Sequence, residues 1–288
     1  MLITYFDEVK YQPEKEPYQW FAGIIWERED LVDHQDTSAD YLYKYVAELE
    51  IAHAISNGVY RFYDLTKYMN MEDEHGRTDE GECSVTFQKE EYESAPEKLP
   101  VGSFRGVEFH CASMKPDDDY ISQYFVFCMG SRVSDGVIGD SRYRVEVNRD
   151  VFDLLSTLLN PSDTPFIDEE GRKTFSHGAV EYYDIHNHPN PLSNQMWREV
   201  FVKHRSFMHQ REYRASLFIS DARFNRICNE GEVTGRDVYD VERVKMDFRL
   251  EFHLRAGRDG DGWRYIEIDT SEFAENLKVG PSKIVELA

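Results

Sequence analysis

The sequence has few of the features that mark secreted, membrane-spanning or zinc-bound proteins. Its four cysteines (Cys83, Cys111, Cys128 and Cys228) form no Cys-x-x-Cys pair, so we expect reduced thiols and neither a disulfide framework nor a zinc site. No apolar run approaches the roughly 20 residues that cross a bilayer. The first eight residues lack the basic opening and the apolar stretch of a signal peptide. We therefore expect a cytoplasmic protein with no membrane partner.

Positive charge is also scarce in this chain. There are 33 Lys and Arg residues against 55 Asp and Glu residues, which gives a formal net charge of −22. A surface that follows a nucleic-acid groove needs clustered positive charge, so this balance argues against one. A small basic site, with nucleic acid as a modified substrate, stays compatible with it. The acidity serves either solubility or an acidic face that docks a basic partner or mimics DNA.

Aromatic residues are plentiful. The chain of 288 residues holds 18 Tyr and 18 Phe, which excludes a generally disordered acidic protein. Its length suits one large domain or two modest ones, with enough residues for a sizeable core. We divide it into an N-terminal hairpin and helix (1–58), a candidate catalytic core (59–220) and a C-terminal β-hairpin extension (221–288).

Hydrophobic periodicity predicts an α+β fold with mixed, mostly antiparallel strands and about three helices. A capping-box pattern and apolar residues at helical spacing predict a helix over 37–57, which Gly58 ends. The other helices are predicted at about 150–159 and 193–204. Strands are predicted at 2–6, 18–26, 59–63, 104–110, 121–129, 142–147, 179–183 and 213–219.

The clearest strand signal lies near the C-terminus. Residues 244–254 and 263–269 alternate apolar and polar side chains, and the glycine-rich segment 257–262 separates them. This pattern predicts an antiparallel hairpin. The segment 121–129 is instead apolar almost throughout, which is typical of a central strand that is buried on both faces.

Two groups of residues could bind a metal ion. His186, Asn187 and His188 form the string of an HNH nuclease, but they stand in a proline-rich loop with no visible partner ligands. Asp7 and Glu8 follow the first predicted strand, where adjacent carboxylates can hold Mg²⁺, and this segment resembles the opening of a bacterial family with an RNase H-like fold. An exposed loop and a solvated turn explain both groups as well. We predict no metal site, with a metal-dependent nuclease as an alternative.

The most specific pattern runs from Phe201 to Arg214, where Phe-Val-Lys precedes Gln-Arg-Glu-Tyr-Arg. It resembles the signature of a group of uncharacterised bacterial proteins, in which a Phe-Lys element precedes Glu-x-Glu-(Tyr/Trp)-Arg. The upstream segments 61–68 and 77–81 fit the same group, so the resemblance covers about residues 58–220. The order of these elements also resembles that of ADP-ribosyltransferases, including the CmdT-like toxins of phage-defence modules.

This resemblance implies an ADP-ribosyltransferase-like core that consumes NAD. Glu212 would be the catalytic carboxylate, because cleavage of the bond between nicotinamide and ribose develops an oxocarbenium charge that a carboxylate stabilises. Gln210, two residues earlier on the same side of an extended chain, would meet the acceptor. Arg61 and Tyr60 would bind NAD, with the guanidinium clamping the pyrophosphate, and Ser131 would orient the nicotinamide.

Toxins of this kind modify nucleic acid or protein and are held inactive by a partner, so the resemblance also implies an antitoxin, and the acidic charge suits a basic one. Simpler interpretations stay open. Glu212 and Arg214 could form a surface ion pair, and Arg61 could stack among its aromatic neighbours. The chain would then be an acidic binding protein without catalysis. If Glu212 is catalytic, we expect it to be partly buried beside an arginine such as Arg214 or Arg77.

Overall fold

The structure, a computed structural model, is a mixed α+β protein with mostly antiparallel strands. This confirms the predicted α+β class with mostly antiparallel strands, although the five α-helices and two 3-10 helices in the described residues exceed the predicted number of about three. The described residues are 40–70, 85–99, 101–104, 107–110, 112–114, 121–133, 140–159, 175–186, 200–230, 232–234, 253–271 and 282–287.

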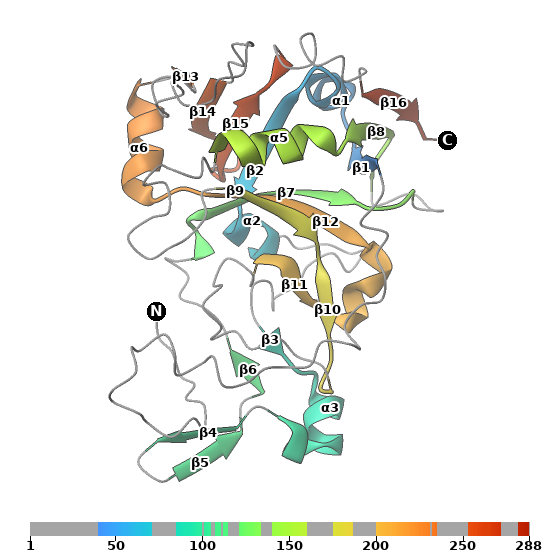
Figure 1. Cartoon of the computed structure of the whole chain (residues 1–288), viewed down its shortest axis with the longest axis vertical. Helices are drawn as coiled ribbons and strands as arrows, with labels where there is room; N and C mark the ends of the chain where they lie inside the picture. Colours follow the sequence, from blue (N-terminus) through green and yellow to red (C-terminus); the bar gives the residue numbers. More distant parts are fainter. Residues whose placement is uncertain are drawn as a thin grey trace.

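Ten strands form one sheet across the upper half of the molecule (Figure 1). They are β1 (Tyr41–Val46), β2 (Val59–Asp64), β7 (Tyr124–Gly130), β8 (Tyr143–Asn148), β9 (Phe175–Ala179), β12 (Glu212–Phe218), β13 (Glu232–Thr234), β14 (His253–Arg258), β15 (Arg264–Asp269) and β16 (Lys283–Glu286). The main order is β13-β14-β15-β2-β7-β1-β8-β16, and β12 and β9 follow from β7 on a second path. The sheet therefore takes strands from all three of the segments predicted as domains.

Strand β7 lies at the centre of this sheet, as its continuous apolar character predicted. On one edge it pairs antiparallel with β12 along its whole length. On the other edge it pairs with β2 near its start and with β1 at its end. The sheet consequently divides beside β7, and residues at the end of β7 face the beginning of β12.

The two faces of the central strands have different surroundings. One face carries the main core, which includes Phe127 of β7 and Leu217 of β12, and helices α1 (Leu49–Ser56), α5 (Asp150–Leu159) and α6 (Asp221–Glu230) contribute to it. The opposite face meets helix α2 (Leu65–Asn70) and a smaller cluster around Val126, Phe201 and Phe218. Side chains alternate between faces along a strand, so Glu212 and Arg214 lie on this second face.

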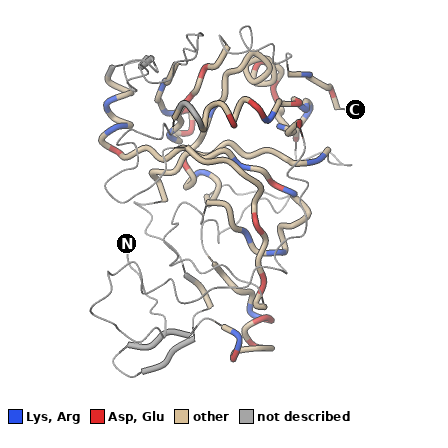
Figure 2. Tube along the Cα trace, in the orientation of Figure 1, with Lys and Arg blue, Asp and Glu red and all other residues tan. Residues whose placement is uncertain are grey.

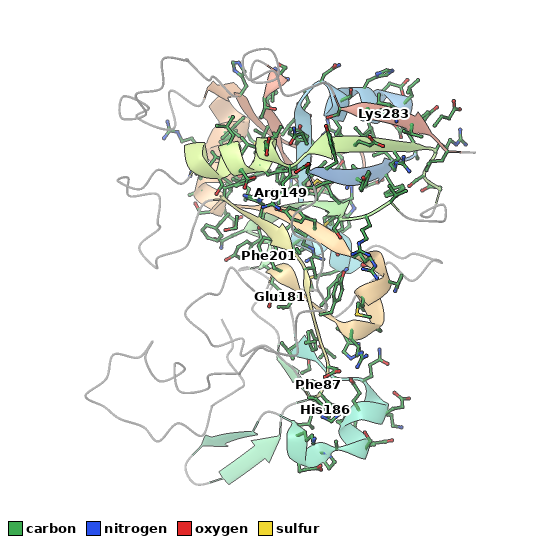
Figure 3. The ribbon with its side chains drawn as sticks, turned by 45° about the vertical axis from the view of Figure 1, so that its right-hand side comes forward. Phe87, Arg149, Glu181, His186, Phe201 and Lys283 are labelled. Atoms are coloured by element: carbon green, nitrogen blue, oxygen red, sulfur yellow. The ribbon has the colours of Figure 1, made fainter. Side chains whose placement is uncertain are left out.

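Below the sheet lies a smaller region of short elements. Strands β10 (Glu181–Tyr183) and β11 (Val202–His204) run parallel to each other. Figure 3 marks this region by the labels of Phe87 and His186 at its lower end. A separate cluster that includes Phe87, Tyr183 and Val202 is its core. The remaining elements are β3 (Val85–Thr86), α3 (Lys89–Ser94), η2 (Pro96–Lys98), β4 (Val101–Phe104), β5 (Val107–His110), β6 (Ser113–Met114) and η4 (Arg205–Gln210).

The helix predicted over 37–57 is wrong for Tyr41–Val46, which is strand β1, and residues 37–39 lie outside the described residues. Leu42 and Val46 are both buried, and a spacing of four places two residues on one face of a helix and of a strand alike. The segment forms a strand and not a helix because its backbone pairs with β8. The second half is confirmed as α1, which buries Ala52 and Ile55.

Two further predictions need correction. Of the helix predicted over 193–204, Val202–His204 is strand β11, whose backbone pairs with β10; residues 193–199 lie outside the described residues. The strand predicted over 104–110 is a pair of strands, β4 and β5. In both segments, backbone pairing with a neighbouring strand satisfies the main-chain hydrogen bonds. The strands predicted at 2–6 and 18–26 lie outside the described residues.

An antiparallel hairpin lies where it was predicted, but its turn is shorter than the predicted 257–262, because Gly257 and Arg258 belong to β14. β14 and β15 pair antiparallel from His253 with Asp269 to Arg258 with Arg264, and residues 244–252 lie outside the described part. The turn between them includes Gly262 at φ +88°, a backbone conformation that glycine adopts without strain. In the described residues, no helix is long and apolar enough to cross a membrane.

Candidate functional site

The beginning of β12 holds a buried ion pair. The Nε of Arg214 donates to Oε1 of Glu212 at 2.7 Å, and its Nη2 donates to Oε2 at 3.0 Å. The two residues are neighbours on one face because they are two positions apart in a strand. Nη1 of Arg214 donates to the carbonyl oxygen of Val200 at 2.6 Å, which fixes the guanidinium on the segment before β11. The structure thus supplies the arginine that we expected beside Glu212.

Lys203 of β11 joins this pair from the other side. Its Nζ lies 3.2 Å from Oε2 of Glu212 and donates to Oε1 of Gln210 at 3.0 Å. The backbone N–H of Glu212 donates to the hydroxyl of Tyr182 at 2.9 Å. Glu212, Lys203 and Arg214 are all nearly inaccessible, with 7%, 5% and 1% of their surface exposed. The site is therefore a buried carboxylate held between two cations, with Gln210 bound to one of them.

These contacts set the protonation of the site. Burial raises the pKa of Glu212, but the charges of Arg214 and Lys203 outweigh burial and hold that pKa well below its usual range. Burial raises the pKa of the Cys128 thiol to about 12, and the nearby carboxylate adds to the shift. Glu212 is consequently ionised at neutral pH and Cys128 is a neutral thiol, so Cys128 is no nucleophile here.

Ser131 is tied to the same end of β12. Its backbone N–H and its Oγ both donate to the carbonyl oxygen of Arg211, at 2.8 Å and 2.9 Å. The register places Gly130 opposite Glu212, so Ser131 follows directly beyond this pair. Arg211 has φ 44° and ψ 51°, a left-handed conformation that costs a non-glycine residue roughly 1 kcal/mol. Strained backbone of this kind clusters at functional sites, which makes the junction of η4 and β12 a candidate.

The structure does not bring Arg61 to Glu212. Arg61 Nη2 donates to Oε2 of Glu267 at 2.9 Å, and its guanidinium lies 4.3 Å from the centre of the Tyr265 ring. Its side chain is 45% exposed. It lies on the same face of the sheet as Glu212, but β7 separates β2 from β12. Arg61 is thus available to solvent on that face, with Glu267 as its partner.

Tyr60 points to the opposite face. It is 2% exposed and packs in the main core against Phe127 and Phe152, with ring centres 5.6 Å and 5.5 Å away. A residue next to Arg61 in a strand has to face the other way. The structure therefore separates Tyr60 from Glu212, and its core position explains the aromatic pattern around Arg61. Glu212, Gln210 and Ser131 are the predicted site residues that the structure brings together. The extended chain predicted through Gln210 is wrong, because Gln210 ends the 3-10 helix η4 and Arg211 is left-handed, so Gln210 reaches the site through Lys203.

Of the residues that could bind a metal ion, the structure describes only His186. The backbone N–H of His186 donates to Asp184, and its Nδ1 lies 3.2 Å from Nζ of Lys98. Within the part of the chain that the structure describes, no three His, Cys, Asp or Glu side chains group as metal ligands do. Asn187, His188 and the acidic pair at 7–8 lie outside that part, as does the segment 77–81.

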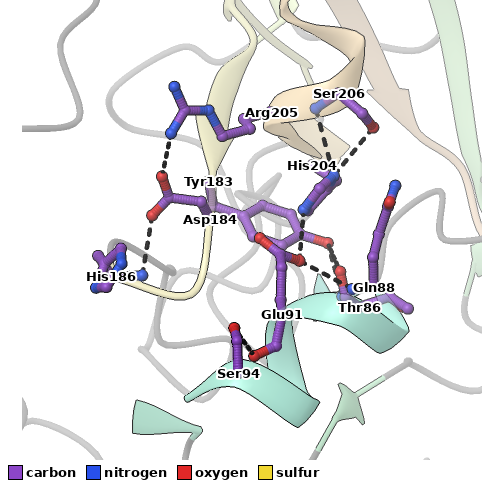
Figure 4. A network of polar contacts seen from close by, with 10 residues as sticks. All are labelled: Thr86, Gln88, Glu91, Ser94, Tyr183, Asp184, His186, His204, Arg205 and Ser206. Atoms are coloured by element: carbon purple, nitrogen blue, oxygen red, sulfur yellow. Dashed lines mark hydrogen bonds and ion pairs between the residues drawn. The ribbon is translucent and has the colours of Figure 1, made fainter.

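Sequence reasoning missed two parts of this region. Lys203 was placed in a helix, so its position beside Glu212 was hidden, although it stood in the quoted Phe-Val-Lys motif. The second part is a polar network in which Glu91 of α3 meets His204 of β11 (Figure 4). No local pattern signals this contact, because 113 positions separate the two residues.

No protein-family model, curated protein or solved structure matches this chain. The function of the site consequently has to be argued from its own geometry.

Proposed function

We propose that the protein is an NAD-consuming ADP-ribosyltransferase in which Glu212 is the catalytic carboxylate. The observation that carries this proposal is the state of Glu212. Its carboxylate is ionised, and two hydrogen bonds from Arg214 and a cation from Lys203 fix it in place. A carboxylate whose position is fixed in advance needs no reorganisation when positive charge develops beside it.

The chemistry requires such a charge. The glycosidic bond between ribose and nicotinamide breaks, the electron pair leaves with nicotinamide, and the ribose carbon becomes positive until a nucleophile attacks it. In this proposal Glu212 faces that carbon. Gln210 orients the attacking group, and its binding to Nζ of Lys203 through Oε1 directs its amide N–H₂ elsewhere, as a donor. Ser131 shapes the same end of the site through its bonds to Arg211.

In this proposal Arg61 binds the pyrophosphate of NAD. Arg61 would have to exchange Glu267 for the phosphates, and its exposed side chain on the same face as Glu212 makes this exchange sterically open. A phosphate competes well for guanidinium because it accepts two parallel hydrogen bonds. Tyr60 has no place in this proposal, because its ring belongs to the core on the other face.

We further propose that this activity is that of a toxin or a phage-defence effector in the cytoplasm, with protein or nucleic acid as the acceptor. The net charge of −22 supports a basic antitoxin as the partner. It also disfavours tight binding of long nucleic acid, so a nucleic-acid acceptor would be recognised locally at Gln210.

Release of nicotinamide from NAD by the purified protein tests the proposal. We expect release by the wild-type protein and a loss of at least about 100-fold in Glu212→Asp, which keeps the charge beside Arg214 but withdraws the carboxylate by one methylene. Glu267→Asp is the matched control at saturating NAD, because it shortens another sheet glutamate that is paired with arginine. The thermal stability of both variants has to be compared. Absence of nicotinamide release from folded wild-type protein would overturn the proposal.

An acidic binding protein without catalysis is the second candidate, and the net charge is the observation that favours it. Figure 2 shows acidic and basic residues interspersed along the described trace. This protein would release no nicotinamide but would bind a basic partner, with an affinity that falls steeply as salt rises. Titration with a polylysine peptide at two salt concentrations distinguishes this candidate from the transferase.

A further inference from the structure

A second polar network, separate from Glu212, links α3 to the junction of β11 and η4 (Figure 4). Nε2 of His204 lies 2.9 Å from Oε2 of Glu91. Nδ1 of the same ring lies 2.9 Å from Oγ of Ser206. A carboxylate, an imidazole and a hydroxyl are thus hydrogen-bonded in series, which is the arrangement that activates a serine nucleophile.

The hydrogen bonds determine which ring nitrogen of His204 carries the proton. The backbone N–H of Ser206 can only donate, and it is directed at Nδ1 at 3.3 Å. Nδ1 is therefore an acceptor, and Nε2 carries the hydrogen that is directed at Glu91. In this tautomer Nδ1 can accept the hydroxyl proton of Ser206, and the carboxylate of Glu91 stabilises the imidazolium that would result.

Both the acid and the ring are held firmly. Oε2 of Glu91 also accepts from the backbone N–H of Gln88 at 2.9 Å, in the capping box of α3. The ring of Tyr183 meets the ring of His204 edge to face, with centres 5.5 Å apart. The hydroxyl of Tyr183 is bound in turn to both backbone groups of Thr86. Because these contacts already fix the orientation of His204, the base loses little conformational entropy when it reacts.

The three residues of this network differ in their exposure to solvent. His204 is buried and Glu91 is partly buried, whereas Ser206 is exposed. A nucleophile has to meet its substrate, while its base and the orienting acid function best away from water. The order of exposure in this network therefore fits a nucleophile at the surface with its supporting groups beneath it.

We propose that Ser206 is a nucleophile that accepts acyl groups from carboxylic esters, with His204 as its general base and Glu91 as a positioning residue. Oγ of Ser206 attacks the ester carbonyl carbon while its proton passes to Nδ1 of His204. The bond to the leaving alkoxide then breaks, and the imidazolium returns the proton to that alkoxide. Water hydrolyses the acyl-serine by the same base, which restores the hydroxyl. This activity needs no NAD and is independent of Glu212.

A purely structural role is the competing explanation, because the His204 side chain also caps η4 by accepting from the Ser206 backbone. That role requires the ring and the amide but not the Ser206 hydroxyl. It predicts loss of stability in His204 variants and no special reactivity at Ser206. The two explanations consequently differ in covalent chemistry, which can be measured directly.

A fluorophosphonate probe followed by mass spectrometry tests the proposal. Ser206 should displace fluoride and carry one probe per chain, about 100-fold faster than Ser94, an exposed serine of α3 whose hydroxyl donates to a backbone carbonyl instead. Ser206→Ala should abolish this labelling, and Ser94→Ala should leave it unchanged.

Variants of the supporting residues give the second measurement. Glu91→Gln keeps the capping hydrogen bond but removes the charge, so the melting temperature should hold while turnover of p-nitrophenyl acetate falls about tenfold in kcat with KM unchanged. His204→Gln should lower the labelling rate about 100-fold. Labelling of Ser206 no faster than that of Ser94, or labelling that survives unchanged in Glu91→Gln and His204→Gln, would overturn the proposal.

Discussion

The sheet contains two arginine–glutamate pairs with different surroundings. Glu212 and Arg214 stand two positions apart in β12, and both side chains are buried. Arg61 and Glu267 face each other across β2 and β15, and the arginine is 45% exposed. Each pair has a hydrogen bond from guanidinium to carboxylate, at 2.7 Å and 2.9 Å. The pairing differs in one respect: Arg214 binds both carboxylate oxygens of Glu212, whereas Nε and Nη2 of Arg61 both donate to Oε2 of Glu267.

Burial distinguishes the two ion pairs more strongly than their geometry does. In water an ion pair contributes about 0–1 kcal/mol, because solvent and salt screen it. A buried charge without a partner is strongly destabilising. Removal of one partner therefore lowers the free energy of unfolding substantially, even where the intact pair adds little to stability. A protein gains nothing in stability from burying Glu212 with two cations when apolar residues would pack as well. This lack of benefit is one reason to look for a function at Glu212 rather than at Glu267.

Truncation of Glu212 should give the largest effect. Glu212→Ala leaves the charges of Arg214 and Lys203 buried without their carboxylate, and we expect the free energy of unfolding to fall by about 3–5 kcal/mol. Urea denaturation followed by fluorescence measures this. A loss below 1 kcal/mol would show that water or another anion reaches the two cations.

The second-largest effect should be the pH dependence of stability, which should differ between the two ion pairs. The pKa of Glu212 is lower in the folded protein than the roughly 4.3 of an unfolded glutamate. Its contribution to stability is therefore complete above that unfolded value, and it declines as pH falls through the folded pKa. Below about pH 4, the wild-type protein should lose up to about 1.4 kcal/mol per pH unit more than Glu212→Gln does. Equal slopes of stability against pH would contradict an ionised buried Glu212.

A double-mutant cycle should sharpen the comparison further. For Glu212→Gln and Arg214→Gln, the coupling in the free energy of unfolding should be on the order of 2–3 kcal/mol, because the residues share a buried contact. The same cycle for Arg61→Gln and Glu267→Gln should give less than about 1 kcal/mol. Couplings of similar size would remove the distinction drawn here between the two pairs.

The smallest effect should come from the exposed pair alone. Glu267→Gln should change the free energy of unfolding by about 0.2–1 kcal/mol, because Arg61 keeps its contact with the Tyr265 ring and reaches water. This difference should vanish in about 1 M salt, where the Debye length is about 3 Å. Thermal melts at low and high salt give the result, and a loss that is indifferent to salt would indicate a packing role for Glu267 instead.

Much of the fold could be predicted from the sequence because its local signals agree with long-range pairing. The apolar run over 121–129 indicated a central strand, and the alternation over 263–269 indicated a hairpin strand. The prediction for residues 41–46 was wrong because the spacing of Leu42 and Val46 fits the helical period as well as the strand period. The choice between them depends on pairing with β8, about 100 residues later in the chain.

The candidate site was predictable only where it is local. Glu212 and Arg214 share a face because a strand repeats every two residues, and the sequence shows that. The bond from Ser131 to Arg211 depends on the register of β7 with β12, and the partner of Arg61 lies 206 positions away. Lys203 was hidden by the wrong assignment of β11 to a helix. Such contacts depend on the order and register of the strands, and a short sequence motif contains no information on either.

The most direct test of the central claim compares the two glutamates by activity instead of stability. The rate of nicotinamide release from NAD should be measured for wild-type protein, Glu212→Asp and Glu267→Asp, each checked for folding by circular dichroism. At saturating NAD, where a change in binding through Arg61 has no effect on the rate, we predict that Glu212→Asp loses at least about 100-fold, while Glu267→Asp stays within about twofold. Release that is equal in the two variants, or no release by the wild-type protein, would contradict the account.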